Sequence, residues 1–182
     1  MKKPYGWTIW LTGRPASGKT TLARALRRKL NQQGISAVLL DSDEVRRVVA
    51  ASAAYAPEER DWFYNRLVEI AAWLVNSGEN VIIAATGSRH SYREAARARL
   101  APRYAEVWVR CPVAVCRARD PKGLYAQAAA GAIANLPGCD AAYDPPTAPA
   151  VVIDTDRQTP KQAVETIIDH LPFLQREAAA CA

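Results

Sequence analysis

Eight residues, Gly13 to Thr20, fit the pattern G-x-x-x-x-G-K-[ST], which is typical of a phosphate-binding loop. The two glycines allow the backbone to curl so that successive N–H groups point at the phosphates of a nucleoside triphosphate. The helix expected after the loop adds its positive N-terminal end. Lys19 would then reach the β- and γ-phosphates, and the Thr20 hydroxyl would ligate the Mg²⁺ ion that bridges them. A strand-to-helix turn with a chance lysine is the alternative, but the apolar strand before the loop and the helical pattern after it favour a nucleotide site.

A second candidate site element is the pair Asp41 and Asp43, which follows an apolar run predicted to be a strand over 35–40. In open α/β sheets, ligands bind at the carboxyl ends of the strands. The two carboxylates are therefore expected near the phosphate loop. An N-cap of the following helix is the structural alternative for either of them.

Strand and helix patterns alternate along the chain and must position these residues. This alternation predicts an α/β P-loop NTPase fold, a three-layer sandwich of a five-stranded parallel sheet with right-handed crossovers and helices on both faces. A short helical segment is expected to carry Arg46 and Arg47. The expected strands are 7–12, 35–40, 81–85, 104–110 and 151–154, and the other expected helices are 19–33, 57–77, 91–100 and 160–171.

Residues 120–149 break this rhythm, because they are rich in Ala, Gly and Pro and contain few large aliphatic side chains. Loops of that length inside compact domains are usually lids or binding loops. We therefore expect a lid over about 119–149. A disordered surface insertion is the alternative, since low hydrophobicity also suits disorder.

Length and composition bound the class of protein. The chain has 182 residues, of which 49% are hydrophobic, so one P-loop kinase domain over 1–182 is expected. The net charge of +6 favours anionic partners. No basic run is interleaved with aromatics and no apolar stretch approaches the roughly 20 residues needed to span a bilayer, so neither nucleic acid nor a membrane is an expected partner. The four cysteines form no C-x-x-C pair, and we expect a cytoplasmic protein with reduced thiols.

The chain resembles the adenylylsulfate (APS) kinase family over nearly its whole length. The resemblance rests on the phosphate loop, on D-S-D-E-V-R at 41–46, on Y-R-E at 92–94 and on A-R-D-P-K-G-L-Y at 118–125. The last motif is the most specific, because generic nucleotide kinases do not share it. The resemblance implies transfer of the ATP γ-phosphoryl group to the 3′-hydroxyl of APS, with Mg²⁺, a closing lid and a homodimer.

The resemblance also implies roles for individual residues. Lys19, Asp41 and Asp43 would be catalytic, with Thr20 and Asp41 serving the metal, and Arg46 and Arg60 would hold the phosphosulfate part of APS through their planar guanidinium groups. As lone charges, these arginines would be read as surface salt-bridge partners. The residues expected to hold ATP are Gly13, Ala16, Ser17, Gly18, Lys19, Thr20, Thr21, Arg117, Arg119 and Lys122.

The acceptor half of the site departs from the family pattern. Where the family reads I-K-G-F-T-G-I-D in the lid, this chain has Leu136 in place of the phenylalanine that stacks on the APS adenine and Ala134 in place of the lysine. Phe63 stands where the family has a substrate-reading asparagine. Base stacking is worth roughly 1–3 kcal/mol in single-stranded nucleic-acid binding, so these changes would weaken APS binding unless other residues compensate. The expected acceptor-binding residues are Arg46, Tyr55, Arg60, Phe63, Arg66, Arg89 and Leu136, with Tyr55 keeping an aromatic ring that the family also has.

Three functions stay open at this point. The first is an ATP-dependent APS kinase with an altered acceptor pocket. The second is a kinase of the same family that phosphorylates a hydroxyl of a different anionic, nucleotide-like small molecule. The third is a non-catalytic ATP-binding regulatory module, which the intact Lys19, Thr20, Asp41 and Asp43 disfavour.

Overall fold

A computed structural model describes residues 5–49 and 57–175. Its centre is a five-stranded sheet of order β2-β3-β1-β4-β5, in which every neighbouring pair is parallel, as the alternating pattern predicts. The strands are β1 (Thr8–Thr12), β2 (Val38–Asp41), β3 (Val81–Ala84), β4 (Tyr104–Arg110) and β5 (Val151–Asp154).

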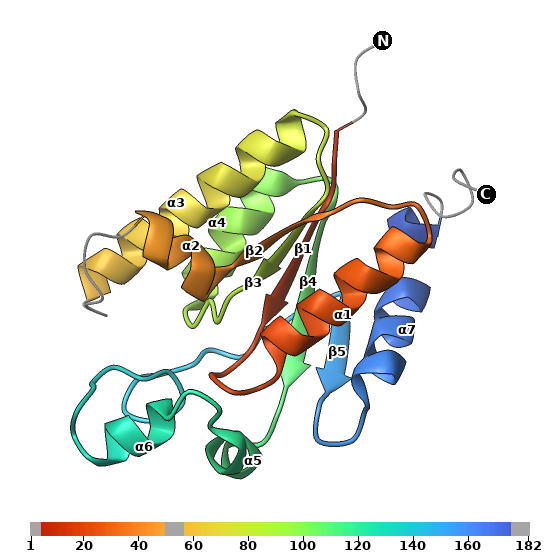
Figure 1. Cartoon of the computed structure of the whole chain (residues 1–182). Coiled ribbons are helices and arrows are strands. Elements are labelled where there is room, and N and C mark those ends of the chain that lie inside the picture. The colour runs from red at the N-terminus through yellow and green to blue at the C-terminus, as the bar shows by residue number, and fades with distance from the viewer. Residues whose placement is uncertain (1–4, 50–56, 176–182) are drawn as a thin grey trace.

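Helices cover both faces of this sheet, and Figure 1 shows α1 and α7 on one face and α3 and α4 on the other. Because parallel strands are buried on both faces, β1 is buried along its whole length. Its Ile9 and Leu11 join the core beneath α1 and α7, whereas Trp10 joins the core beneath α3 and α4. The helices are α1 (Lys19–Gln32), α2 (Ser42–Val49), α3 (Pro57–Asn76), α4 (His90–Leu100), α5 (Val113–Arg119), α6 (Leu124–Ala129) and α7 (Pro160–His170).

The second strand differs from its prediction at both ends. It begins at Val38 rather than Ile35 and ends with Asp41 as its last residue. Asp41 is therefore inside the ladder, paired with Ala84 of β3, and Asp43 lies in the first turn of α2. The other predicted strands and helices agree with the observed bounds to within one residue.

The segment predicted to be a lid lies beyond the carboxyl ends of the strands (Figure 1) and contains α6, which the sequence patterns did not reveal. It is packed rather than disordered, so the alternative of a disordered insertion is wrong. Tyr125 and Leu136 are buried with Cys111 and Cys116 in a small apolar cluster of their own. The Tyr125 hydroxyl donates to the carbonyl of Pro15 in the phosphate loop at 3.2 Å, which ties the segment to that loop. We call residues 119–149 the lid.

Candidate active site

The phosphate loop joins β1 to α1, and glycine is required at positions 13 and 18 for different structural reasons. Gly18 precedes α1 with φ 98°, a left-handed conformation that side chains disfavour. A Cβ on Gly13 would lie 2.4 Å from the carbonyl oxygen of Val109 in β4, so only glycine allows this close approach. Ala16 also has a positive φ, 59°. The loop therefore holds a compact curled backbone, as the motif predicts.

Lys19 lies in the first turn of α1 and folds back over the loop. Its ammonium group donates to the carbonyl oxygens of Gly13 at 2.9 Å and Arg14 at 2.8 Å. Burial lowers the pKa of Lys19 from 10.5 to about 8, against the opposing attraction of Asp43. The group is thus a desolvated cation in a loop shaped for anions.

Three polar side chains converge beside this loop. The Thr20 hydroxyl donates to Asp41 Oδ2 at 2.7 Å, and Asp41 Oδ1 accepts from the backbone N–H of Asp43 at 3.0 Å. Asp41 is therefore buried with both oxygens engaged, and it also caps the start of α2. Asp43 is half-exposed and forms an ion pair with Lys122 of the lid. The functional and the capping interpretations of Asp41 are thus compatible.

A cavity of about 580 Å³ extends from the phosphate loop to the lid. It brings together most of the residues predicted to bind the donor and acceptor. The predicted residues that line it are Ala16, Gly18, Lys19, Thr20, Thr21, Asp41, Asp43, Arg46, Arg60, Phe63, Arg119, Lys122 and Leu136. Gly13 and Ser17 support the loop without lining the cavity.

The two arginines predicted to bind acceptor charge both line the cavity, Arg46 from α2 and Arg60 from α3. The Arg46 guanidinium lies over the Phe63 ring, 3.9 Å from its centroid, which is a cation–π contact. Arg60 donates to the carbonyl of Asn135 in the lid at 2.8 Å. Because Phe63 is buried with Arg46 on its face and Tyr64 at 5.5 Å, its ring is already occupied by protein contacts.

Besides Gly13 and Ser17, three predicted site residues among those that the structure describes do not line the cavity. Arg66 is exposed on α3, because Phe63 and Leu67 turn the buried face of that helix inward. Arg117 is exposed on α5, whose buried residue is Cys116. Arg89 forms an ion pair with Asp61 at 2.9 Å. Tyr55 lies outside the described residues.

The residues at the phosphate loop fit a magnesium ion that arrives with a nucleotide. Mg²⁺ usually keeps several waters and takes one or two carboxylates plus substrate phosphates. Thr20 and Asp41, with oxygens 2.7 Å apart, form such a partial ligand set. Within residues 5–49 and 57–175 no group of three His, Cys, Asp or Glu side chains could hold a metal ion by itself. The same ranges contain no helix with the length and apolar character to cross a membrane.

Thr155 is a cavity residue that the sequence patterns did not single out. Its hydroxyl donates to the carbonyl of Ser17 at 2.9 Å, and Arg119 donates to its carbonyl oxygen at 2.6 Å. It therefore links the phosphate loop to the start of the lid. Its position directly after β5, at the carboxyl edge of the sheet, is the signal that could have found it.

Comparisons with known proteins agree with this geometry. The family model described as adenylylsulphate kinase matches residues 5–154. The adenylyl-sulfate kinase of Paraburkholderia xenovorans is 38% identical over 176 residues, covering 97% of this chain and 98% of the relative. A probable adenylyl-sulfate kinase of Archaeoglobus fulgidus is 43% identical over 152 residues, covering 83% of this chain and 97% of that relative. The Mycobacterium tuberculosis APS kinase CysC in complex with AMPPNP and APS superposes with a TM-score of 0.86 at 36% identity, covering 93% of this chain and 99% of that one. The phosphate loop, the strand-end carboxylates and the lid thus occur in a chain that belongs to the adenylylsulphate kinase family.

Proposed function

We propose that this single P-loop domain is an ATP-dependent kinase that transfers the γ-phosphoryl group of ATP to the 3′-hydroxyl of APS. The observation that carries the proposal is the convergence of Lys19, Thr20, Asp41 and Asp43 in one cavity. The related M. tuberculosis enzyme, which binds AMPPNP and APS in one structure, supports the assignment of the two ligands.

The arrangement suggests a division of labour between the two carboxylates. Asp41 is buried against Thr20, so it suits the metal, and Mg²⁺ would neutralise charge on the transferring phosphoryl group. Asp43 is half-exposed in the cavity, so it suits the acceptor hydroxyl, whose proton it would take as the P–O bond forms. Lys19 would hold the β- and γ-phosphates in place. Arg46 and Arg60 would bind the anionic part of the acceptor.

The test is release of ADP with APS as the acceptor, measured by a coupled assay and by direct detection of the 3′-phosphorylated product. Lys19→Met and Asp43→Asn should each reduce turnover at least about a hundredfold, because each removes charge at the reacting groups. Arg97→Lys, a conservative change outside the cavity, is the matched control. Absence of APS-dependent ADP release at millimolar APS would overturn the proposal.

A second candidate is phosphorylation of a different anionic, nucleotide-like acceptor. Two observations favour keeping it. The lid presents Leu136 where the family has its stacking phenylalanine, and the Phe63 ring face is covered by Arg46, so neither supplies an open stacking surface. The same assay with a panel of nucleoside phosphates and phosphosulfates decides between the candidates, by the ratio of kcat/KM values.

A homodimer is part of the proposal, since the family resemblance implies one. Trp73 on α3 is 70% exposed, which is unusual for a large aromatic side chain and suits a protein contact. Sedimentation equilibrium of the purified chain, compared with Trp73→Glu, tests the oligomeric state. A chain that sediments as a monomer would remove the homodimer from the proposal.

A further inference from the structure

The side chain of Arg93 on α4 is buried in a polar cluster between the sheet and the lid, and it has no role in the kinase reaction proposed above. Its exposed fraction is 0%. Its Nε lies 2.8 Å from Glu106 Oε1 of β4, whose side chain is 4% exposed. Burying a charged pair is expensive, and apolar residues of similar volume often serve stability as well or better. Packing and stability alone therefore do not explain why this pair is present.

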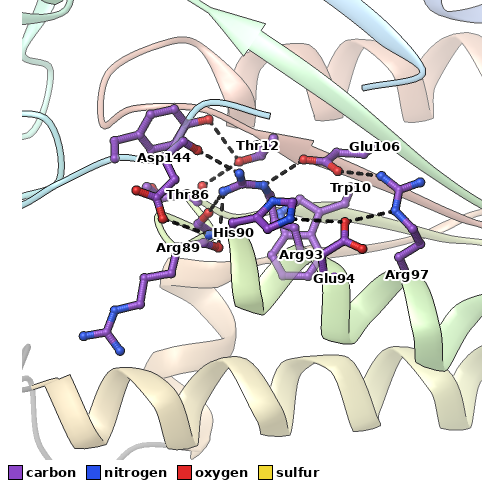
Figure 2. Close-up of polar contacts among 12 residues, drawn as sticks. Trp10, Thr12, Thr86, Arg89, His90, Arg93, Glu94, Arg97, Glu106 and Asp144 are labelled. Atoms are coloured by element: carbon purple, nitrogen blue, oxygen red, sulfur yellow. Dashed lines mark hydrogen bonds and ion pairs between the residues drawn. The ribbon is translucent and has the colours of Figure 1, made fainter. Parts of the chain in front are cut away.

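The remaining donors of Arg93 bind backbone carbonyls of two segments that are distant in sequence. One terminal nitrogen, Nη1, donates to the carbonyls of Gly87 and Arg89. Both residues belong to the loop that joins β3 to α4, residues 85–89, which we call the β3 loop. The other, Nη2, donates to the carbonyl of Asp144 in the lid at 2.7 Å. Figure 2 shows the guanidinium between these segments, with Glu106 on its other side. One planar group thus joins the lid to the β3 loop.

The lid is fastened at the same point by its own residues. The backbone N–H of Asp144 donates to the carbonyl of Ser88 at 2.8 Å. The Asp144 carboxylate accepts from the N–H of His90 at 3.0 Å, which satisfies a free donor in the first turn of α4 (Figure 2). Residues 143–144 therefore form the fixed end of the lid.

Tyr143 extends this attachment to the central strand. Its ring contacts two guanidinium groups, with the ring centroid 5.2 Å from Arg14 Cζ and 5.9 Å from Arg93 Cζ. Its hydroxyl is hydrogen-bonded to the Thr12 hydroxyl, 3.2 Å away, and Thr12 donates to the carbonyl of Thr86 at 2.7 Å. The chain of contacts thus runs from the lid to the end of β1 and on to the β3 loop.

This loop forms part of the cavity wall. Thr86 and Ser88 both line the cavity, on the side where Phe63 and Tyr64 lie. The N–H of Gly87 donates to the Tyr64 hydroxyl at 2.8 Å, so the loop is also tied to α3. Movement of the loop would therefore alter the acceptor side of the cavity more than the phosphate loop.

We infer that Arg93 is a positioning residue that holds the β3 loop and the fixed end of the lid in one arrangement, and thereby shapes the acceptor side of the cavity. The inference rests on the proposed kinase function for its kinetic consequence. Arginine suits the role because its rigid fork can donate to three carbonyls while its charge faces Glu106. Lysine keeps the charge but is a flexible point donor, so it cannot span the same carbonyls.

Arg97 offers a matched control on the same helix. It also pairs with Glu106, with Nη2 2.9 Å from Oε2, but its side chain is 41% exposed and its other ion pair is with Glu94 on the same helix. Arg93→Lys and Arg97→Lys therefore make the same chemical change against the same carboxylate. Only the first removes contacts to the β3 loop and the lid.

The experiment compares these two variants and Tyr143→Phe with the unaltered protein, by steady-state kinetics and by hydrogen exchange. Arg93→Lys should raise the KM for the acceptor about three- to tenfold, the range that loss of one or two hydrogen bonds supports, and leave the KM for ATP within about twofold. Tyr143→Phe, which removes one hydroxyl and no charge, should change the same KM in the same direction. Both variants should speed hydrogen exchange in peptides covering 86–90 and 141–145. Arg97→Lys should change neither the acceptor KM nor the exchange rate of these peptides.

Equal rises in both KM values, or an unchanged acceptor KM with unchanged exchange, would overturn the inference. If Arg93→Lys does not fold, Tyr143→Phe alone decides by the same measures. If the unaltered protein does not phosphorylate APS, the proposed function fails. The exchange comparison between the variants still tests the positioning role in that case.

Discussion

The pKa of Lys19 makes the binding of ATP dependent on pH in a window that can be calculated. Burial holds this pKa at about 8 in the ligand-free protein, whereas phosphates against the ammonium group would raise it again. Below pH 8 the cation is already present. Above pH 8 the protein must take up a proton when the nucleotide binds, so affinity falls as pH rises through this pKa.

The magnitude follows from the protonated fraction. With a pKa of about 8, roughly three-quarters of the Lys19 side chains are protonated at pH 7.5 and roughly one-tenth at pH 9. The dissociation constant of Mg-AMPPNP should therefore increase about eightfold between these pH values. At pH 8.5, binding should take up about 0.8 proton per nucleotide, because that fraction of the side chain is neutral before binding.

Isothermal titration calorimetry in buffers of different ionisation enthalpy measures both quantities. Cys116 and Tyr125 do not titrate in this window, because burial raises the pKa of each to about 12. Lys19→Arg, whose guanidinium stays protonated, is the control and should show no proton uptake. A pH-independent affinity for the unaltered protein, or equal proton uptake by Lys19→Arg, would refute the reasoning.

Three further predictions concern the metal, the lid and the acceptor. Thr20→Val should raise the Mg²⁺ concentration for half-maximal activity at least about tenfold, whereas Thr20→Ser should keep it within about threefold; equal values for the two variants would remove the hydroxyl from the metal site. Lys122→Met should shift Tm by less than about 2 °C, because its ion pair with Asp43 is half-exposed. Its kcat/KM for ATP should nevertheless fall about tenfold, and a large loss of Tm would assign the pair to stability instead. Leu136→Phe should lower the KM for APS at least about fivefold by adding a stacking ring, with Leu136→Met as the size control; an unchanged KM would place Leu136 away from the adenine.

The fold was predictable where its signals are local. Apolar runs of strand length and helical periodicity predicted the elements of the three-layer sandwich, since each of these patterns lies within one segment. The helix α6 was missed because its Ala-rich sequence has no apolar periodicity, and its buried Tyr125 packs against residues of other segments. Contacts of that kind are not visible in a local pattern.

The buried pair of Arg93 and Glu106 shows the same limit in the candidate site. The alternation of β4 places Ala105, Val107 and Val109 on one face, so Glu106 reads as a solvent-facing residue of a half-exposed strand. In the structure α4 covers that face, and Glu106 is buried there against Arg93. The donor half of the site was predictable because its motif is continuous. The acceptor half depends on which helix faces point inward, and this left Arg66 outside the cavity. Arg117, predicted for the donor half but lying on α5 rather than in the loop motif, is outside the cavity for the same reason.

The contacts that join the lid to the rest of the protein differ in burial, and this difference has a consequence for the proposed reaction. Lys122 with Asp43, and Arg60 with the Asn135 carbonyl, are exposed contacts of residues that would bind the two substrates. Exposed ion pairs contribute about 0–1 kcal/mol, so incoming phosphates and sulfate can replace them at small cost. The bond of Tyr143 to Thr12 is buried and that of Asp144 to Arg93 is partly buried, and neither involves a residue assigned to a substrate. We therefore expect substrates to rearrange the lid near Lys122 and Asn135 while its fixed end keeps its place. Within the lid, the protection from hydrogen exchange that is gained on substrate binding should be confined to 119–140.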